Sequence, residues 1–259
     1  MEHRVHPMKG IRNFRDFGGY DTEDGRKVQM GRLFRSGHFN LAEESDLEAI
    51  QNLNIRMQVD LRRPDERERM PGRWSGEVLI THDGGREMEA PHQRFLKEVS
   101  ATGEDSHQWM HDYYTKAPFR PHHVSMFRDW FDGLVKLGSD EGGLVNCAAG
   151  KDRTGILCGL TLTALGVDEQ TILDDYEFTN VAAKVDERLP EATSYYNNLM
   201  GKSYSEDVYR PFVGVHRDFL ITAWSAIRDK HGSIETYLTD VIGVDVEKRE
   251  TLRQGYLLD

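Results

Sequence analysis

The segment GLVNCAAGKDRTGILCGLTLTALG, residues 143–166, has the clearest chemical signature in the sequence. Its pattern predicts a buried strand, a tight loop and then an apolar helix. Ala148, Ala149 and Gly150 have little or no side chain, so successive backbone N–H groups can converge on an anion beside the positive end of the helix. Small residues between a strand and a helix are typical of a phosphate-binding loop.

Three side chains in this segment have the types that phosphoryl transfer needs. Cys147 ends the strand and faces the predicted N–H groups, which favour a thiolate able to attack phosphorus in line; a buried core thiol is the weaker alternative. Arg153, six positions later, has a planar fork that can bind two phosphate oxygens as charge redistributes. The hydroxyl of Thr154 either hydrogen-bonds the sulfur and helps it leave or caps the helix.

The leaving oxygen of a phosphate ester needs a proton, and Asp152 is the best-placed carboxylate in the sequence to donate it. In the alternative, Asp152 orients the loop or Lys151, and Asp83, Asp60 or Asp112 supplies the proton. The basic neighbours of Asp152 favour its charged form, whereas a bound phosphate dianion favours its protonated form. We therefore expect an acidic pH optimum.

The remaining candidates for cofactor or redox chemistry are few. The sequence has two cysteines, and Cys158 lies within the predicted apolar helix, where a structural core role is expected. No disulfide framework follows, and a reducing cytoplasm is the natural setting. The 11 histidines include adjacent His122 and His123, but no spacing predicts a metal site. We expect neither a metal nor an organic cofactor.

The overall charge and hydropathy limit the partners. A formal net charge of −11 argues against nucleic acid or an anionic membrane as the main partner, so an anionic ligand must bind in a local basic pocket. The sequence has no apolar run of roughly 20 residues, and its start, MEHRVHPMKG, lacks a secretion signal. The expectation is a cytoplasmic protein without stable membrane insertion.

Alternating strand-like and helical patterns predict an α/β fold in a single domain over residues 1–259. An apolar period over 41–53 predicts a helix packed on the sheet, and helices are expected from about Asp168 onward, with stops at Gly232 and Gly243. The segment from about 84 to 121 is either a helical lid over the site or a solvated surface insertion. The predicted core strands are residues 31–36, 55–61, 78–82 and 143–147.

The loop NCAAGKDRTG, residues 146–155, resembles the HCxxGKDRTG motif of atypical bacterial and fungal protein tyrosine phosphatases, which include triple-specificity enzymes. The resemblance covers nearly the whole chain and implies a cysteine-phosphatase fold: a central, mostly parallel sheet, helices on both sides and a helical lid. Further matching segments are NFRDFGGY (13–20), GRLFRSGHF (31–39), VDLRRPDE (59–66) and HGSIETYLTDVIGV (231–244).

The resemblance also implies roles and substrates. Cys147 would be the nucleophile, Arg153 the phosphate clamp, Lys151 a contributor to phosphate or phosphoinositide affinity, and Asp152 an acid or orienting carboxylate. The implied substrates are phosphotyrosine proteins, with phosphoserine, phosphothreonine and phosphoinositides as further candidates, and inorganic phosphate as product. The full predicted phosphate-binding set is Ala148, Ala149, Gly150, Lys151, Asp152, Arg153 and Thr154.

Asn146 departs from the motif, which has histidine before the cysteine. An asparagine amide can donate a hydrogen bond but cannot be charged, so reduced or shifted activity is expected. The alternative is a catalytically weak or inactive phosphate-binding module of the same fold. A further group of arginines is expected to form ion pairs and hydrogen bonds that brace the loop rather than to act in catalysis. These are Arg12, Arg15, Arg35, Arg62 and Arg63.

Overall fold

A five-stranded sheet in the order β1-β3-β6-β4-β5 lies at the centre of the computed structural model, which describes residues 1–85 and 102–259. The inner strands run parallel, and β1 pairs antiparallel with β3 at one edge. The predicted α/β fold is therefore confirmed, and all four predicted core strands are present with small differences at their ends. The strands are β1 (Arg15–Asp16), β3 (Leu33–Ser36), β4 (Ile55–Asp60), β5 (Val78–Ile80) and β6 (Gly142–Asn146).

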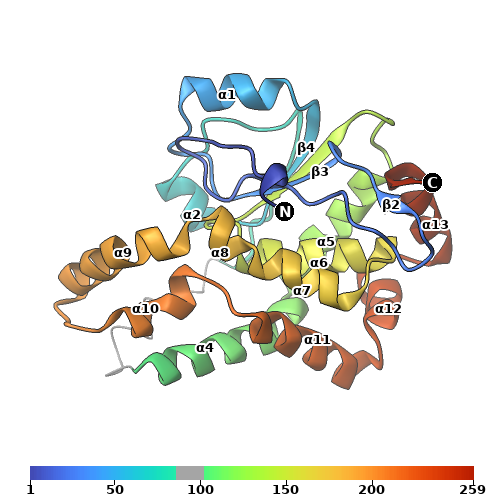
Figure 1. The fold of residues 1–259 in the computed structure, drawn as a ribbon. Helices are drawn as coiled ribbons and strands as arrows, with labels where there is room; N and C mark the ends of the chain where they lie inside the picture. Colours follow the sequence, from blue (N-terminus) through green and yellow to red (C-terminus); the bar gives the residue numbers. More distant parts are fainter. Residues whose placement is uncertain (86–101) are drawn as a thin grey trace.

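The inner strands β3, β4 and β6 are covered on both faces of the sheet, so nearly all of their residues are buried, including polar ones such as Arg35 and Asn146. Successive residues of β6 point to opposite faces, so Val145 packs in the larger apolar cluster together with Val59, and Leu144 packs in a smaller cluster together with Ile55. In Figure 1, α1 (Glu44–Gln51) lies above the sheet, whereas α5 (Pro121–Leu134) and α6 (Asp152–Leu165) lie below it. Covering both faces leaves the carboxyl ends of the parallel strands as the edge where a site can open.

The helices begin and end at residues with clear local causes. The predicted helix over 41–53 is α1, which begins after Glu43 in a reciprocal capping arrangement with Asp46. The described helical elements before residue 166 are the 3₁₀ turn η1 (Glu2–Arg4), α1 (Glu44–Gln51), α2 (Pro64–Arg69), α4 (Gly103–Lys116), the 3₁₀ turn η2 (Ala117–Phe119), α5 (Pro121–Leu134) and α6 (Asp152–Leu165).

From Asp168 onward the chain is mainly helical, as predicted. Helix α11 (Arg217–His231) ends before Gly232, which has φ 82°, and the π-helical turn η3 (Leu238–Ile242) ends before Gly243, which has φ 80°. The C-terminal residues form β7 (Leu257–Leu258), which pairs antiparallel with β2 (Lys27–Val28). These helices are α7 (Glu169–Glu177), α8 (Thr179–Ala182), α9 (Val185–Met200), α10 (Glu206–Val213), α11 (Arg217–His231), α12 (Ile234–Tyr237), the π-helical turn η3 (Leu238–Ile242) and α13 (Val246–Tyr256).

The predicted lid segment, about 84 to 121, lies partly outside the described residues, because 86–101 are not described. In its described part, α4 packs along α10 and α11 and buries Met110 and Tyr114 in the larger apolar cluster. This part of the segment is thus integrated into the core, and its role as a lid stays a prediction. Among the described residues, no helix has the length and apolar character needed to span a bilayer.

Candidate active site

The loop between β6 and α6 makes a sharp turn that requires glycine at position 150. Gly150 has φ +69°, and a Cβ at this position would lie 2.3 Å from backbone atoms of Ser36. The chain of β3 therefore packs directly against the loop. This close approach explains why the sequence has its smallest residue in the middle of the segment.

Two carbonyl groups of this loop accept hydrogen bonds from N-terminal segments of the chain. Gly150 O accepts hydrogen bonds from Asn13 Nδ2 at 2.7 Å and Arg35 Nη2 at 3.0 Å, and Ala148 O accepts one from His38 N at 3.3 Å. Within residues 1–85 and 102–259, no hydrogen bond is made by the backbone N–H groups of residues 148–154. A run of free N–H groups at a helix N-terminus is an anion-binding arrangement.

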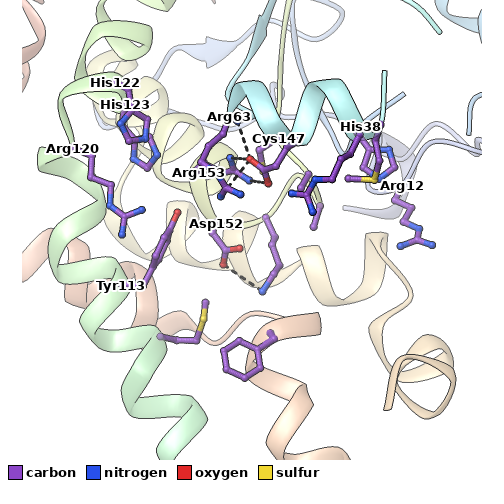
Figure 2. A pocket seen from close by; sticks show the side chains of 18 of the residues that line it. Arg12, His38, Arg63, Tyr113, Arg120, His122, His123, Cys147, Asp152 and Arg153 are labelled. Atoms are coloured by element: carbon purple, nitrogen blue, oxygen red, sulfur yellow. Dashed lines mark hydrogen bonds and ion pairs between the residues drawn. The ribbon is translucent and has the colours of Figure 1, made fainter. Parts of the chain in front are cut away.

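The loop lines a cavity of about 340 Å³. Figure 2 shows Cys147 and Arg153 at the middle of this pocket, with Arg120 and Tyr113 on one side and Arg12 on the other. Cys147 is 2 % exposed, and it belongs to the larger apolar cluster while also lining the pocket. Of the predicted phosphate-binding residues, Ala148, Ala149, Lys151, Asp152 and Arg153 line the same pocket.

Arg153 is held in place by a carboxylate from α2. Its Nη1 donates to Glu66 Oε2 at 2.7 Å and to Leu61 O at 2.9 Å, and its Nη2 donates to Glu66 Oε1 at 2.9 Å. Burial alone would raise the pKa of Glu66, but the charge and hydrogen bonds of Arg153 outweigh it and lower the pKa to about 2. Burial also opposes the charge of Arg153, yet Glu66 and Cys147 keep its pKa well above the ordinary value.

Asp152 is the one of the four predicted acid candidates that lines the pocket. Its Oδ1 accepts a hydrogen bond from Tyr114 at 2.8 Å and lies 3.4 Å from Lys151 Nζ. Asp60 is instead buried in an ion pair with Arg62 behind the loop. The other two candidates point to solvent: Asp83 is 93 % exposed, and Asp112 is exposed and bonded to Gln108.

The Thr154 hydroxyl makes neither of the two hydrogen bonds predicted for it, to the Cys147 sulfur or as a helix cap. It is buried at the third position of α6, and its Oγ1 has no hydrogen-bond partner within the described residues. The residue at the cap position is Lys151, whose Nζ donates to Gly214 O at 2.8 Å and Pro211 O at 3.2 Å. Lys151 thus ties the loop to the end of α10, and the thiol-assisting role of Thr154 stays a prediction.

The arginines expected to brace the loop divide into two groups. Arg35 braces the loop from behind: its Nη2 donates to Gly150 O, and its Nη1 donates to Asp175 Oδ2 at 3.0 Å. Arg15 is fully buried beside the same carboxylate. Arg12 differs from the prediction: it is exposed, lines the pocket and makes no ion pair with the described residues. The other two have the expected bonds, Arg62 with Asp60 and Arg63 with Asp65.

A model of the family described as "Tyrosine phosphatase family" matches residues 6–258. The chain belongs to this family. A putative tyrosine-protein phosphatase of Cupriavidus necator is 31% identical to it, over 95% of this chain and 86% of the relative. Triple specificity protein phosphatase PtpB of Mycobacterium tuberculosis is 25% identical, over 91% of this chain and 93% of the relative. A tyrosine-protein phosphatase of Nostoc commune is 25% identical, over 88% of this chain and 72% of the relative. Family membership confirms the enzyme class predicted from the loop.

Asn146 of this tyrosine phosphatase has both of its side-chain groups engaged. Its Nδ2 donates to Asp60 Oδ1 at 3.0 Å, and its Oδ1 accepts from Gln58 Nε2 at 2.8 Å. The amide is fully buried and joins β6 to β4. Its bonds therefore serve the strands beneath the loop, and the effect of asparagine on activity stays a prediction.

The positive charge of the phosphatase pocket comes from arginine and lysine rather than histidine. Burial, together with nearby arginines, lowers the pKa of both His38 and His122 to about 4, so both rings are neutral near pH 7. Arg120, from the N-cap of α5, lies over the Tyr113 ring at 4.8 Å from its centroid. Sequence reasoning missed Arg120 and the tyrosines of α4. The local signal for the tyrosines is the helical spacing of aromatic residues over 109–114, and this spacing does not reveal which face of the helix meets the loop.

Proposed function

We propose that this tyrosine phosphatase hydrolyses phosphate monoesters through a phosphocysteine intermediate on Cys147. The observation that carries the proposal is the set of N–H groups at residues 148–154 that make no hydrogen bond within the described chain, in a loop that lines one pocket together with Cys147 and Arg153. Three nonbridging phosphate oxygens need several donors at once, and a helix N-terminus with an arginine fork supplies them.

The first step transfers the phosphoryl group to sulfur. The Cys147 thiolate attacks phosphorus, the P–S bond forms, and the P–O bond to the leaving group breaks. Asp152 gives its proton to the leaving oxygen, and Arg153 with the loop N–H groups binds the equatorial oxygens. Glu66 and Leu61 O engage both hydrogens of Arg153 Nη1 and one of Nη2, so the Nε–H and the second Nη2–H are the donors left for the phosphate. Because these bonds fix the guanidinium, Arg153 does not have to reorganise during the step.

The second step releases inorganic phosphate. Water attacks phosphorus, the Asp152 carboxylate accepts a proton from that water, and the P–S bond breaks to restore the thiolate. A hydrogen bond from the Thr154 hydroxyl, whose oxygen has no partner in the described chain, would stabilise the departing sulfur. No metal or organic cofactor takes part in these steps.

Phosphotyrosine is the substrate that the pocket walls favour. Trp109 and Tyr113 of α4 and Phe212 of α10 line the cavity, and such rings pack well against an aryl phosphate. The segment 84–121 would act as the lid, because α4 supplies two of these rings. Arg12 and Arg120 at opposite sides would attract acidic residues or additional phosphates, so phosphoserine, phosphothreonine and phosphoinositides are further candidates.

A comparison of two cysteine variants tests this proposal. Turnover of a phosphotyrosine peptide, a phosphoserine peptide and a phosphoinositide is measured for the unaltered enzyme, Cys147→Ser and Cys158→Ser. We expect loss of turnover in Cys147→Ser and its retention in Cys158→Ser, since Cys158 is buried within α6 and burial raises its pKa to about 12. Undiminished turnover by Cys147→Ser would contradict the proposal. If the unaltered protein binds phosphate but shows no turnover, the alternative of a phosphate-binding module would hold instead.

A further inference from the structure

The two oxygens of the Asp152 carboxylate have different surroundings. Tyr114 of α4 donates a hydrogen bond to Oδ1 at 2.8 Å, and Lys151 Nζ lies 3.4 Å from the same oxygen. Among the described residues, none donates a hydrogen bond to Oδ2, and the side chain borders the pocket. One oxygen is thus held by the protein, whereas the other is open to a ligand.

A second tyrosine, Tyr176, fixes the direction in which the Tyr114 hydroxyl donates its hydrogen bond. The hydroxyl of Tyr176, on α7, lies 2.6 Å from that of Tyr114. Burial raises the pKa of both hydroxyl groups well above the ordinary value, so both keep their protons. Because the single hydroxyl hydrogen of Tyr114 goes to Asp152, Tyr176 must donate to Tyr114. The result is a chain of donors from Tyr176 through Tyr114 to Oδ1, in which each bond strengthens the next.

The sequence of the loop makes room for this chain. A Cβ at Gly155, in the first turn of α6, would lie 2.8 Å from ring atoms of Tyr176. The glycine that follows Thr154 therefore lets the Tyr176 ring pack directly on the helix that presents Asp152. Tyr114 itself has no exposed surface, so its hydroxyl cannot turn to solvent instead.

We propose that Tyr114, oriented by Tyr176, is a positioning residue for Asp152. It keeps Oδ1 as a hydrogen-bond acceptor, so the transferable proton resides on Oδ2, the oxygen that is open to the pocket. This inference rests on the proposed function, in which Asp152 protonates the leaving oxygen. As the P–O bond breaks, the Oδ2–H bond breaks and its proton moves to the leaving oxygen, while Tyr114 and Lys151 stabilise the carboxylate that forms.

The loss of the Tyr114 hydroxyl should therefore matter most when the leaving group needs a proton most. In Tyr114→Phe, either oxygen of Asp152 can bear the proton and the carboxyl group can rotate. We expect about a tenfold loss of kcat/KM for an alkyl phosphate and little loss for p-nitrophenyl phosphate, whose leaving group departs readily. A plot of log(kcat/KM) against leaving-group basicity over a series of phenyl phosphates should become steeper.

Two further variants make the test specific. In an Asp152→Asn background, Tyr114→Phe should cause no further change, because the two residues act as one unit. Tyr237→Phe is the matched control, since it removes another buried hydroxyl that donates to Pro118 O at 2.6 Å, and its plot should keep the unaltered slope. If Tyr114→Phe fails to fold, Tyr176→Phe removes the first donor and should steepen the slope to a smaller extent.

The outcomes separate this inference from the function on which it rests. Equal losses over all leaving groups in Tyr114→Phe, or additive losses with Asp152→Asn, would overturn the positioning role while phosphatase turnover remains. An unaltered slope in Asp152→Asn would do the same. Absence of turnover by the unaltered enzyme would instead refute the proposed function, and the inference with it.

Discussion

Glu66 and Arg153 are joined by two nearly parallel hydrogen bonds of 2.7 and 2.9 Å, which tie α2 to the first turn of α6. The two residues are 87 positions apart in the sequence, yet each fixes the other's geometry. Both ions are largely buried, so removing either partner would leave the other as an uncompensated buried charge. The orientation of Arg153, the proposed phosphate clamp, is therefore set by the protein itself.

The Glu66→Gln substitution should weaken the clamp. It removes the negative charge and one acceptor facing the Arg153 fork, and we expect about a tenfold loss of kcat/KM with weaker vanadate binding. Steady-state kinetics and vanadate inhibition measure both quantities. Asp65→Asn is the matched control, because Asp65 lies next to Glu66 on α2 but pairs with Arg63 and Arg69. Equal losses in the two variants would argue against a specific role for Glu66.

The Gly150→Ala substitution should disrupt the loop and abolish most activity. The new methyl group would overlap the backbone of Ser36, and the left-handed φ adds strain. Gly25→Ala is the control, since Gly25 has φ +88° with nothing within 4 Å of its Cβ position. We expect at least a hundredfold loss of kcat/KM in Gly150→Ala, from misplacement of the donors, and near-normal activity in Gly25→Ala. Comparable activities would contradict the packing of the loop on β3.

The Asp175→Asn substitution should destabilise the fold. Asp175 is buried between Arg15 and Arg35, and these arginines lower its pKa although burial opposes this. Removing its charge leaves two buried guanidinium groups without a counterion, which costs about 3–5 kcal/mol of the free energy of unfolding. Urea denaturation measures the loss. The neighbouring Asp174→Asn should cost much less, because Asp174 is partly exposed and pairs with Arg217, which is also partly exposed.

Stability should fall as the pH is lowered below the ordinary histidine pKa of 6.5. Burial lowers the pKa of His38 and His122 to about 4 and that of His123 further, so the unfolded chain binds protons that the folded one does not. Glu66, with a folded pKa of about 2, adds a second loss between its ordinary value of 4.5 and about 2. Urea midpoints measured over this pH range should decrease steadily toward acid.

A histidine substitution checks the origin of this pH dependence. His123 is buried with Nδ1 2.8 Å from Ala117 O, a bond that an asparagine amide can also make. In His123→Asn the decrease in stability between pH 6.5 and 4 should be shallower than in the unaltered protein, because burial lowers the pKa of His123 well below its ordinary value. A pH dependence of His123→Asn identical to that of the unaltered protein would exclude His123 as a cause.

The parts of this protein that could be predicted from sequence are those determined locally. The parallel strands, α1, the loop with Gly150 and the helix stops at Gly232 and Gly243 follow from apolar periodicity and backbone preference within short windows. The bracing role of Arg35 was also predictable, because a charged residue within a buried strand must find a partner. The placement of Cys147 and Arg153 in one pocket agrees with the prediction, and their catalytic roles stay predictions.

The remaining features depend on contacts between distant segments. Nothing near Glu66 in the sequence indicates that it pairs with Arg153, and nothing near Tyr114 indicates Asp152, because helix packing sets both pairs. Sequence reasoning favoured Asp152 as the acid, but for the same reason it could not show that Asp152, of the four candidates, is the one that lines the pocket. Arg12 was expected to be bonded, but its loop turns it toward the pocket instead.

The most direct test of the phosphocysteine is to trap it. The unaltered enzyme is mixed with a phosphotyrosine peptide and quenched with acid within one turnover, and its proteolytic peptides are analysed by mass spectrometry. We predict one phosphoryl group on the peptide that contains Cys147, and none on that peptide in Cys147→Ser. Turnover with the phosphoryl group on another residue, or with no phosphoenzyme while Cys147→Ser remains active, would contradict the proposed mechanism.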